Sequence, residues 1–133
     1  MSTESDASSF AGAWPNYTGE FADKMNSMLK VVVSRTLTDP AWNNTIVLRG
    51  DVVDDVTELK AQDGGPVLVA GSKTLVHTLL DNDLVDVLRL MVFPVTIGYG
   101  LRVFPETIKK TQWTMTDTLT FSSGVRVDTY QPT

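Results

Sequence analysis

Residues that could bind a phosphate surround Gly71, near the middle of the chain. A breaker, Gly64-Gly65-Pro66, precedes an apolar run over residues 67–70, and Gly71 ends that run. Helical spacing comes next, with apolar side chains at Leu75, Val76, Leu79 and Leu80, so the pattern predicts a strand, a tight turn and a helix. The free N–H groups at this helix start, on Ser72, Lys73 and Thr74, would point out of a sheet's carboxyl edge, as in helix N-termini that hold phosphate. The same turn also occurs in strand–helix units that bind nothing, and both interpretations remain open.

A second group of polar residues follows three consecutive valines. Residues 31–33 fit a strand buried on both faces, as in a parallel sheet. Ser34, Arg35 and Thr36 then fall at the carboxyl end of that strand, which is the edge where open α/β sheets bind ligands. The three residues could meet polar groups of a cofactor, or they could simply mark where the strand reaches the surface.

Acidic residues invite a metal or general-base interpretation, but a structural role explains them better. Four of them fit the N-cap and first turns of a helix that runs to about Gln62, namely Asp51, Asp54, Asp55 and Glu58. A later acidic group lacks the glycine and glutamate of a calcium loop. His77 is the only histidine and the chain has no cysteine, so the usual zinc ligand sets cannot form. The sequence predicts no metal site.

Composition limits the class of protein. The chain has 133 residues, a formal net charge of −5 and a pI near 4.6, which weighs against a nucleic-acid partner. No signal peptide is evident, and the longest apolar stretch, residues 84–97, is charged and too short to span a membrane. We expect a cytoplasmic protein with no membrane or nucleic-acid partner. Residues 1–9 are polar and acidic and predict a disordered tail, followed by a single domain over residues 10–133.

The remaining pattern predicts the fold class. Helical spacing after Thr18 and after Asp51 alternates with strand-like runs at residues 30–36 and 45–48, and a long apolar strand is expected over residues 85–95. Residues 112–130 alternate apolar and polar side chains around Ser122-Ser123-Gly124, which predicts a hairpin. The sequence therefore predicts an α/β protein whose mixed, mostly parallel sheet carries a C-terminal antiparallel hairpin.

Four of these motifs resemble a known family. They are residues 32–36 (VVSRT), 65–72 (GPVLVAGS), 79–90 and 94–104, in that order, and the likeness covers roughly residues 10–131. The chain resembles the dihydrofolate-reductase-like proteins, and most closely the reductase domain of the bifunctional deaminase-reductase of riboflavin biosynthesis.

The resemblance implies a function and a set of cofactor contacts. Members of this family have a three-layer fold and use NADPH to reduce a pterin or pyrimidine-type heterocycle, such as 5-amino-6-(5-phosphoribosylamino)uracil. By resemblance, Ser34, Arg35 and Thr36 would meet the adenosine end, and Arg35 would pair with the 2′-phosphate. The pyrophosphate side would be formed by Val69, Ala70, Gly71, Ser72, Lys73 and Leu75. A homodimer is also a family expectation.

The chain also departs from the family pattern. Ala70 stands where the family usually has the first of two adjacent glycines, so a methyl group lies where the backbone approaches the cofactor. The family's first strand and helix, and its Gly-Arg-Lys/Arg-Thr phosphate stretch, have no counterpart among these residues. No catalytic residue can be assigned from the sequence. The alternative expectation is a truncated, inactive module of this family that binds nucleotide or dimerises.

Overall fold

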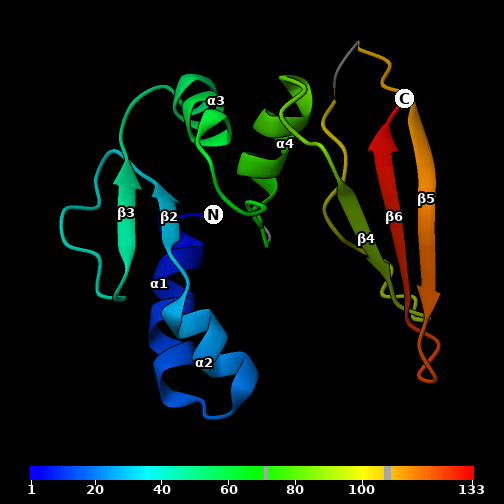
Figure 1. Ribbon diagram of the computed structural model, residues 1–133. Coiled ribbons are helices and arrows are strands. Elements are labelled where there is room, and N and C mark those ends of the chain that lie inside the picture. The colour runs from blue at the N-terminus through cyan, green and yellow to red at the C-terminus, as the bar shows by residue number, and fades with distance from the viewer. Residues whose placement is uncertain (71, 107–108) are drawn as a thin grey trace. The chain divides into compact units, whose positions relative to one another are not determined.

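The computed structural model describes residues 1–70, 72–106 and 109–133. They form two compact units, Met1–Thr78 and Leu79–Thr133, so the residues expected to build one domain are divided between them (Figure 1). Each three-stranded sheet draws its strands from one unit only. The structure contains the parallel strands, the helices and the antiparallel C-terminal hairpin that the sequence predicts. The parallel strands form one sheet, and the hairpin belongs to the other.

The N-terminal unit is built on a parallel sheet. Its strands are β1 (Ser2–Thr3), β2 (Lys30–Val33) and β3 (Thr45–Leu48), in the order β1-β2-β3. Residues of β2 pair with β3 over their full length, and Ser2 and Thr3 pair with Val32 and Val33. Val32 is 1% exposed, as expected for a strand that is covered on both faces.

The N-terminal unit also contains helices. They are α1 (Glu4–Ala13), α2 (Glu20–Ser27) and α3 (Val52–Ala61), with a 3₁₀ turn at Trp14–Asn16, and α4 (Lys73–Asp81) begins in this unit. The core contains Ala22, Val31, Val32, Trp42, Val56 and Leu75. Asp51 caps α3, since its Oδ1 accepts from the backbone N–H groups of Val53 at 2.9 Å and Asp54 at 3.3 Å. The structural interpretation of this acidic group is confirmed.

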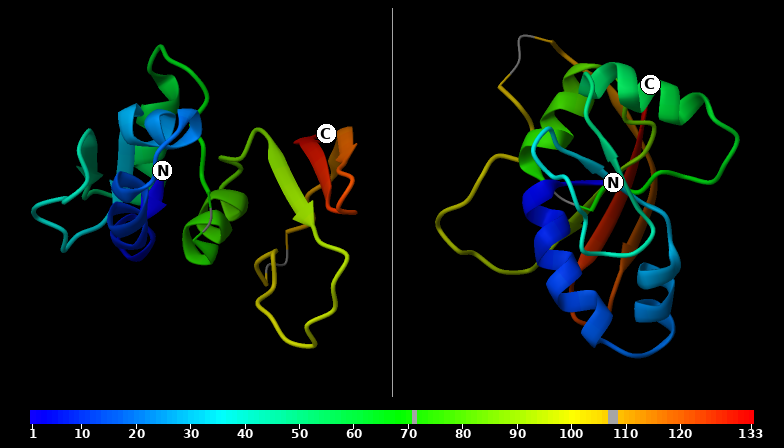
Figure 2. Two further views of the ribbon diagram at one scale, coloured as in Figure 1. Left: turned by 90° about the horizontal axis from the view of Figure 1, so that it is seen from below. Right: turned by 90° about the vertical axis from the view of Figure 1, so that its left-hand side faces the viewer.

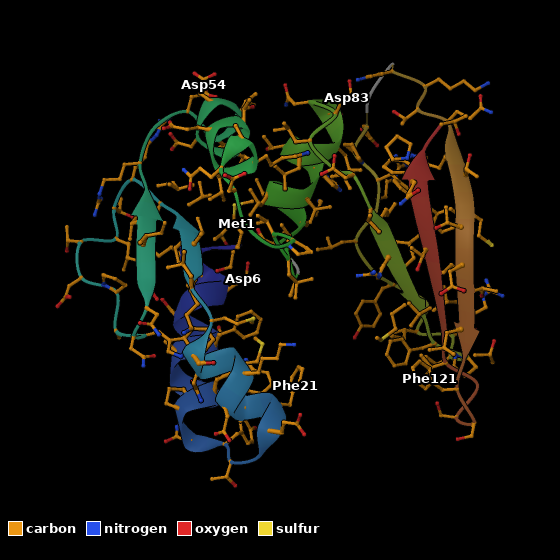
Figure 3. All side chains as sticks on the ribbon, in the orientation of Figure 1. Met1, Asp6, Phe21, Asp54, Asp83 and Phe121 are labelled. Atoms are coloured by element: carbon orange, nitrogen blue, oxygen red, sulfur yellow. The ribbon has the colours of Figure 1, made fainter. Side chains whose placement is uncertain are left out.

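The prediction of a disordered tail over residues 1–9 is wrong. Residues 2–3 form β1, and α1 starts at Glu4 (Figure 2, where the blue helix lies beside the N-terminus). Thr3 donates a side-chain hydrogen bond to Asp6 Oδ2 at 2.7 Å, and Figure 3 labels Asp6 on this helix. The polar segment becomes ordered because its backbone pairs with the edge of β2 and its side chains find polar partners.

The predicted strand over residues 67–70 is not part of a sheet. Among the described residues none pairs with it in a ladder, and Val67 and Leu68 are 42% and 59% exposed. The N-terminal amino group of Met1 donates a hydrogen bond to the Leu68 carbonyl oxygen of this segment at 2.5 Å. An apolar run becomes a strand only where a neighbouring strand satisfies its backbone groups.

The C-terminal unit is an antiparallel sheet. Its strands are β4 (Leu88–Val92), β5 (Trp113–Thr120) and β6 (Arg126–Pro132), in the order β4-β6-β5. The expected strand over residues 85–95 is therefore shorter than the pattern suggests, and the hairpin of β5 and β6 is confirmed. Gly124 turns the hairpin with φ +83°, and its N–H donates to the Phe121 carbonyl oxygen at 2.9 Å. Among the described residues, no helix is both long and apolar enough to span a bilayer.

Candidate functional site

The carboxyl end of β2 carries a local turn built by Ser34. The Ser34 backbone N–H continues the ladder by donating to the Leu48 carbonyl oxygen at 3.1 Å. Its Oγ then accepts from the backbone N–H groups of Thr36 at 3.1 Å and Leu37 at 2.9 Å. This is how a serine ends a strand, because its hydroxyl replaces the lost backbone partners. The predicted group of residues 34–36 thus lies at the predicted edge.

A carboxylate is bound to the hydroxyl groups of this turn. Glu4 Oε2, at the start of α1, accepts from Thr36 Oγ1 at 2.6 Å and from Ser34 Oγ. These two bonds, that from Ser34 first, lower the pKa of Glu4 below its ordinary value, so the group is anionic at neutral pH. Ser34 is buried and Glu4 is half-buried.

Glu4 is not among the residues predicted for a site, because it lies in the segment expected to be disordered. A signal was present, since Thr3-x-x-Asp6 has the spacing of a capping box and predicts a helix starting at Glu4. The parallel register then places Glu4 beside Ser34, one step beyond the Thr3–Val33 pair. Only the pairing of β1 with β2 reveals this contact.

Two arginines lie near this polar turn, Arg35 by its position in the sequence and Arg49 through a hydrogen bond. Arg35 stands between the two hydroxyl residues and is exposed. Arg49 Nη2 donates to the Leu37 carbonyl oxygen, which holds the segment after the turn against the end of β3. The cluster of Glu4, Ser34, Arg35 and Thr36 is called the β2 turn site below. Its hydroxyl groups bind an oxyanion, in this case a carboxylate of the same chain.

The predicted pyrophosphate group is described in part. Gly71 lies outside the described residues. Ser72 has φ +60°, and its Oγ accepts a long hydrogen bond from the Leu75 N–H at 3.5 Å, while α4 begins at Lys73 as predicted. Lys73 and Ala70 are exposed and Val69 is half-buried. Leu75 is 3% exposed, so its side chain belongs to the core.

An apolar cavity of about 400 Å³ lies in the same unit. Ala70 and Val32 both line it, together with Met1, Phe10, Met28, Trp42 and Leu68 among others. Lys30 also lines it, but its Nζ donates to the carbonyl oxygens of Asn26, Met28 and Asn43 at 2.6, 2.8 and 3.0 Å, and lies 4.6 Å from the Trp42 ring centre. Burial lowers the pKa of Lys30. Its bonds give this lysine a structural role.

The two predicted groups have no direct bond with each other. Val32, in the strand that ends at Ser34, and Ala70 of the second group line the same cavity, but Ser34, Arg35 and Thr36 are not among its lining residues. Of the described residues, those at 34–36 and those at 69–73 have no hydrogen bond or ion pair with one another. No cluster of three His, Cys, Asp or Glu side chains that could hold a metal occurs within residues 1–70, 72–106 and 109–133.

The chain matches the model of the RibD C-terminal domain family over residues 7–127. It belongs to that family. It is also 32% identical over 111 residues to the "Uncharacterized protein YyaP" of Bacillus subtilis (strain 168), an alignment that covers 84% of the chain and 58% of YyaP. The family predicted from the four motifs is confirmed.

A solved structure shows the fold. The chain is similar to the crystal structure of a "Putative riboflavin biosynthesis protein" from Shewanella sp. PV-4, with a TM-score of 0.73 and 18% sequence identity. The similarity covers 99% of this chain and 72% of that one. The dihydrofolate-reductase-like fold predicted for this RibD-type domain is therefore confirmed. The chain spans 58% of the length of YyaP, the curated relative that it matches.

Proposed function

We propose that this RibD-type domain is an NADPH-dependent reductase of a pterin or pyrimidine-type heterocycle, similar to 5-amino-6-(5-phosphoribosylamino)uracil reductase. The observation that carries the proposal is the β2 turn site, where Ser34 and Thr36 already hold an oxyanion at the ligand-binding edge of a parallel sheet. Membership of the RibD C-terminal domain family supports the same reaction class.

The hydroxyl and guanidinium donors of this site suit the 2′-phosphate of NADPH, which would have to displace the Glu4 carboxylate from the two hydroxyl groups. Two hydroxyl groups donate into one position there, and Arg35 adds an exposed guanidinium from the same turn. A guanidinium suits a phosphate because its planar N–H groups can donate two parallel hydrogen bonds. Lys73, exposed at the start of α4, supplies a positive charge for the pyrophosphate. The bound cofactor would supply the hydride, and the residues named here would bind and orient it.

Cofactor titration tests the proposal. NADPH is expected to change the fluorescence of Trp14, Trp42 or Trp113 in a saturable way, with a dissociation constant in the range of about 1–100 μM. Arg35→Ala should weaken binding about 10- to 100-fold, since it removes a charge-assisted hydrogen bond to phosphate. Arg102→Ala is the matched control, because its exposed partner is Glu106 in the other unit. Absence of saturable binding up to about 1 mM NADPH would exclude the proposal.

A second candidate is a nucleotide-binding or dimerising module of the same family that has no turnover. The observation that favours it is Glu4, whose carboxylate occupies the hydroxyl groups that the cofactor would need. Loss of NADPH absorbance in the presence of the purified chain and a heterocyclic substrate would exclude this candidate. Binding of NADPH without any oxidation would favour it.

A further inference from the structure

We propose that Glu4 determines the cofactor preference of the β2 turn site by placing a negative charge where the 2′-phosphate would bind. This inference rests on the proposed function and deepens it. In enzymes that bind dinucleotides, an acidic side chain at such an edge accepts from the ribose 2′-hydroxyl of NADH, whereas an arginine accommodates the 2′-phosphate of NADPH. This chain has both types of residue at one turn, Glu4 and Arg35.

The Glu4 carboxylate occupies the hydroxyl donors of the β2 turn site. Glu4 Oε2 accepts from Thr36 Oγ1 at 2.6 Å and also from Ser34 Oγ. Each hydroxyl has one proton to donate, so neither can donate to a phosphate while both donate to Glu4. The carboxylate and the phosphate therefore compete for the same two protons.

Neighbouring contacts hold the Glu4 carboxylate in place. The residue before Glu4 pairs with Val33 in the parallel ladder, and its side chain donates to Asp6 at 2.7 Å. Glu4 is thus fixed at the junction of β1 and α1, next to the end of β2. Moving its carboxylate away means breaking two side-chain hydrogen bonds.

The charges of Glu4 and Arg35 act in opposite directions on a bound phosphate. A phosphate dianion beside the anionic Glu4 is repelled, whereas a neutral ribose 2′-hydroxyl can donate to the same carboxylate. Arg35 acts in the opposite direction, since its guanidinium attracts phosphate. The presence of both charges makes the wild-type preference between NADPH and NADH small, and removal of the Glu4 charge shifts it toward NADPH.

The experiment compares two nucleotides that differ by one phosphate. Adenosine 2′,5′-bisphosphate and adenosine 5′-monophosphate are titrated into wild type, Glu4→Gln and the control Glu20→Gln by calorimetry. Glu20 is an exposed carboxylate in the first turn of α2, so its substitution changes net charge equally. Glu4→Gln is expected to tighten binding of the bisphosphate about fivefold or more relative to the monophosphate, as expected for a unit charge at about 4 Å in water. Glu20→Gln should leave the ratio unchanged.

Each outcome decides the inference. If wild type binds both nucleotides and Glu4→Gln leaves their affinity ratio unchanged, the inference is overturned and the proposed function stands. If neither protein binds either nucleotide or NADPH, the proposed function fails and the inference fails with it. Circular dichroism checks that the variant keeps its helices, and Glu4→Ala takes its place in the titrations if Glu4→Gln does not fold.

Discussion

The middle strands of the two sheets have the same number of neighbours but different surroundings. In the N-terminal unit, β2 lies between β1 and β3, and its Val31 and Val32 are 6% and 1% exposed. In the C-terminal unit, β6 lies between β4 and β5, but side chains on its neighbours, such as Met91 and Leu119, are 59% and 53% exposed. The helices of the two units account for part of this contrast.

Two flanking strands satisfy the backbone of a strand, but only a second layer of structure covers its side chains. In the N-terminal unit, α2 and α3 supply Ala22 and Val56 to the core. In the C-terminal unit, the described residues between β4 and β5 contain no helix. We therefore expect side-chain burial to stabilise the first unit and the strand ladder to stabilise the second.

The largest effect is expected from shortening a buried valine. Val32→Ala should lower the free energy of unfolding by about 2–3 kcal/mol, from lost apolar burial plus the cavity that it leaves. Val92→Ala removes the same atoms from β4, where the side chain is 45% exposed, and should cost less than about 1 kcal/mol. Urea denaturation followed by circular dichroism measures both values. Equal losses of unfolding free energy for the two variants would contradict the difference in side-chain burial between the two units.

A smaller effect is expected at the hairpin turn of the second unit. Gly124→Ala should cost about 1–2 kcal/mol, because φ +83° is unfavourable for alanine and the new Cβ would lie 3.2 Å from Pro94 Cγ. Gly98→Ala is the matched control, with the same φ but no atom within 4 Å of the added Cβ. Thermal unfolding of the two variants should separate the steric part from the backbone part. A smaller loss of thermal stability for Gly124→Ala than for Gly98→Ala would contradict the predicted steric cost at the hairpin turn.

The smallest effect, and the one that depends on pH, concerns Asp128. This β6 carboxylate is 3% exposed and accepts from Thr118 Oγ1 at 2.7 Å and from Arg126 Nε at 3.0 Å. The hydrogen bond from Thr118 is the main cause of its lowered pKa, with Arg126 adding to it. Because the folded pKa lies below the unfolded one, the stabilisation is complete above the unfolded value and is lost as pH falls through the folded value.

Asp128→Asn should therefore lower the melting temperature at pH 7 by less than Val32→Ala does, because Arg126 is half exposed and its pairing is screened. The difference from wild type should shrink as the pH falls below about 4, the range in which an ordinary aspartate becomes protonated. Thermal melts between pH 7 and pH 3 measure it. A difference that grows on acidification would contradict this role. Asp117→Asn is the control, since Asp117 is an exposed carboxylate on β5.

Much of the local structure could be predicted from the sequence. The valine strand, the Asp51 cap of α3, the helical spacing of α3 and α4, and the hairpin around Gly124 follow from short-range patterns of apolar, acidic and turn-forming residues. Four motifs in order also predicted the RibD-type family, which the match over residues 7–127 confirms. These features are local because helix, cap and turn preferences depend on residues a few positions apart.

The tertiary structure decided what the local patterns could not. Residues 67–70 have the composition of a strand but no ladder partner among the described residues, and residues 2–3 have no strand pattern but pair with β2. Composition alone predicts neither the unpaired apolar run nor the paired N-terminal residues, because a strand forms only when another strand is available beside it. The same applies to the β2 turn site. The sequence predicts that Ser34, Arg35 and Thr36 lie at the end of a strand. The pairing of β1 with β2 brings Glu4, about thirty residues away in the sequence, to the hydroxyl groups of Ser34 and Thr36.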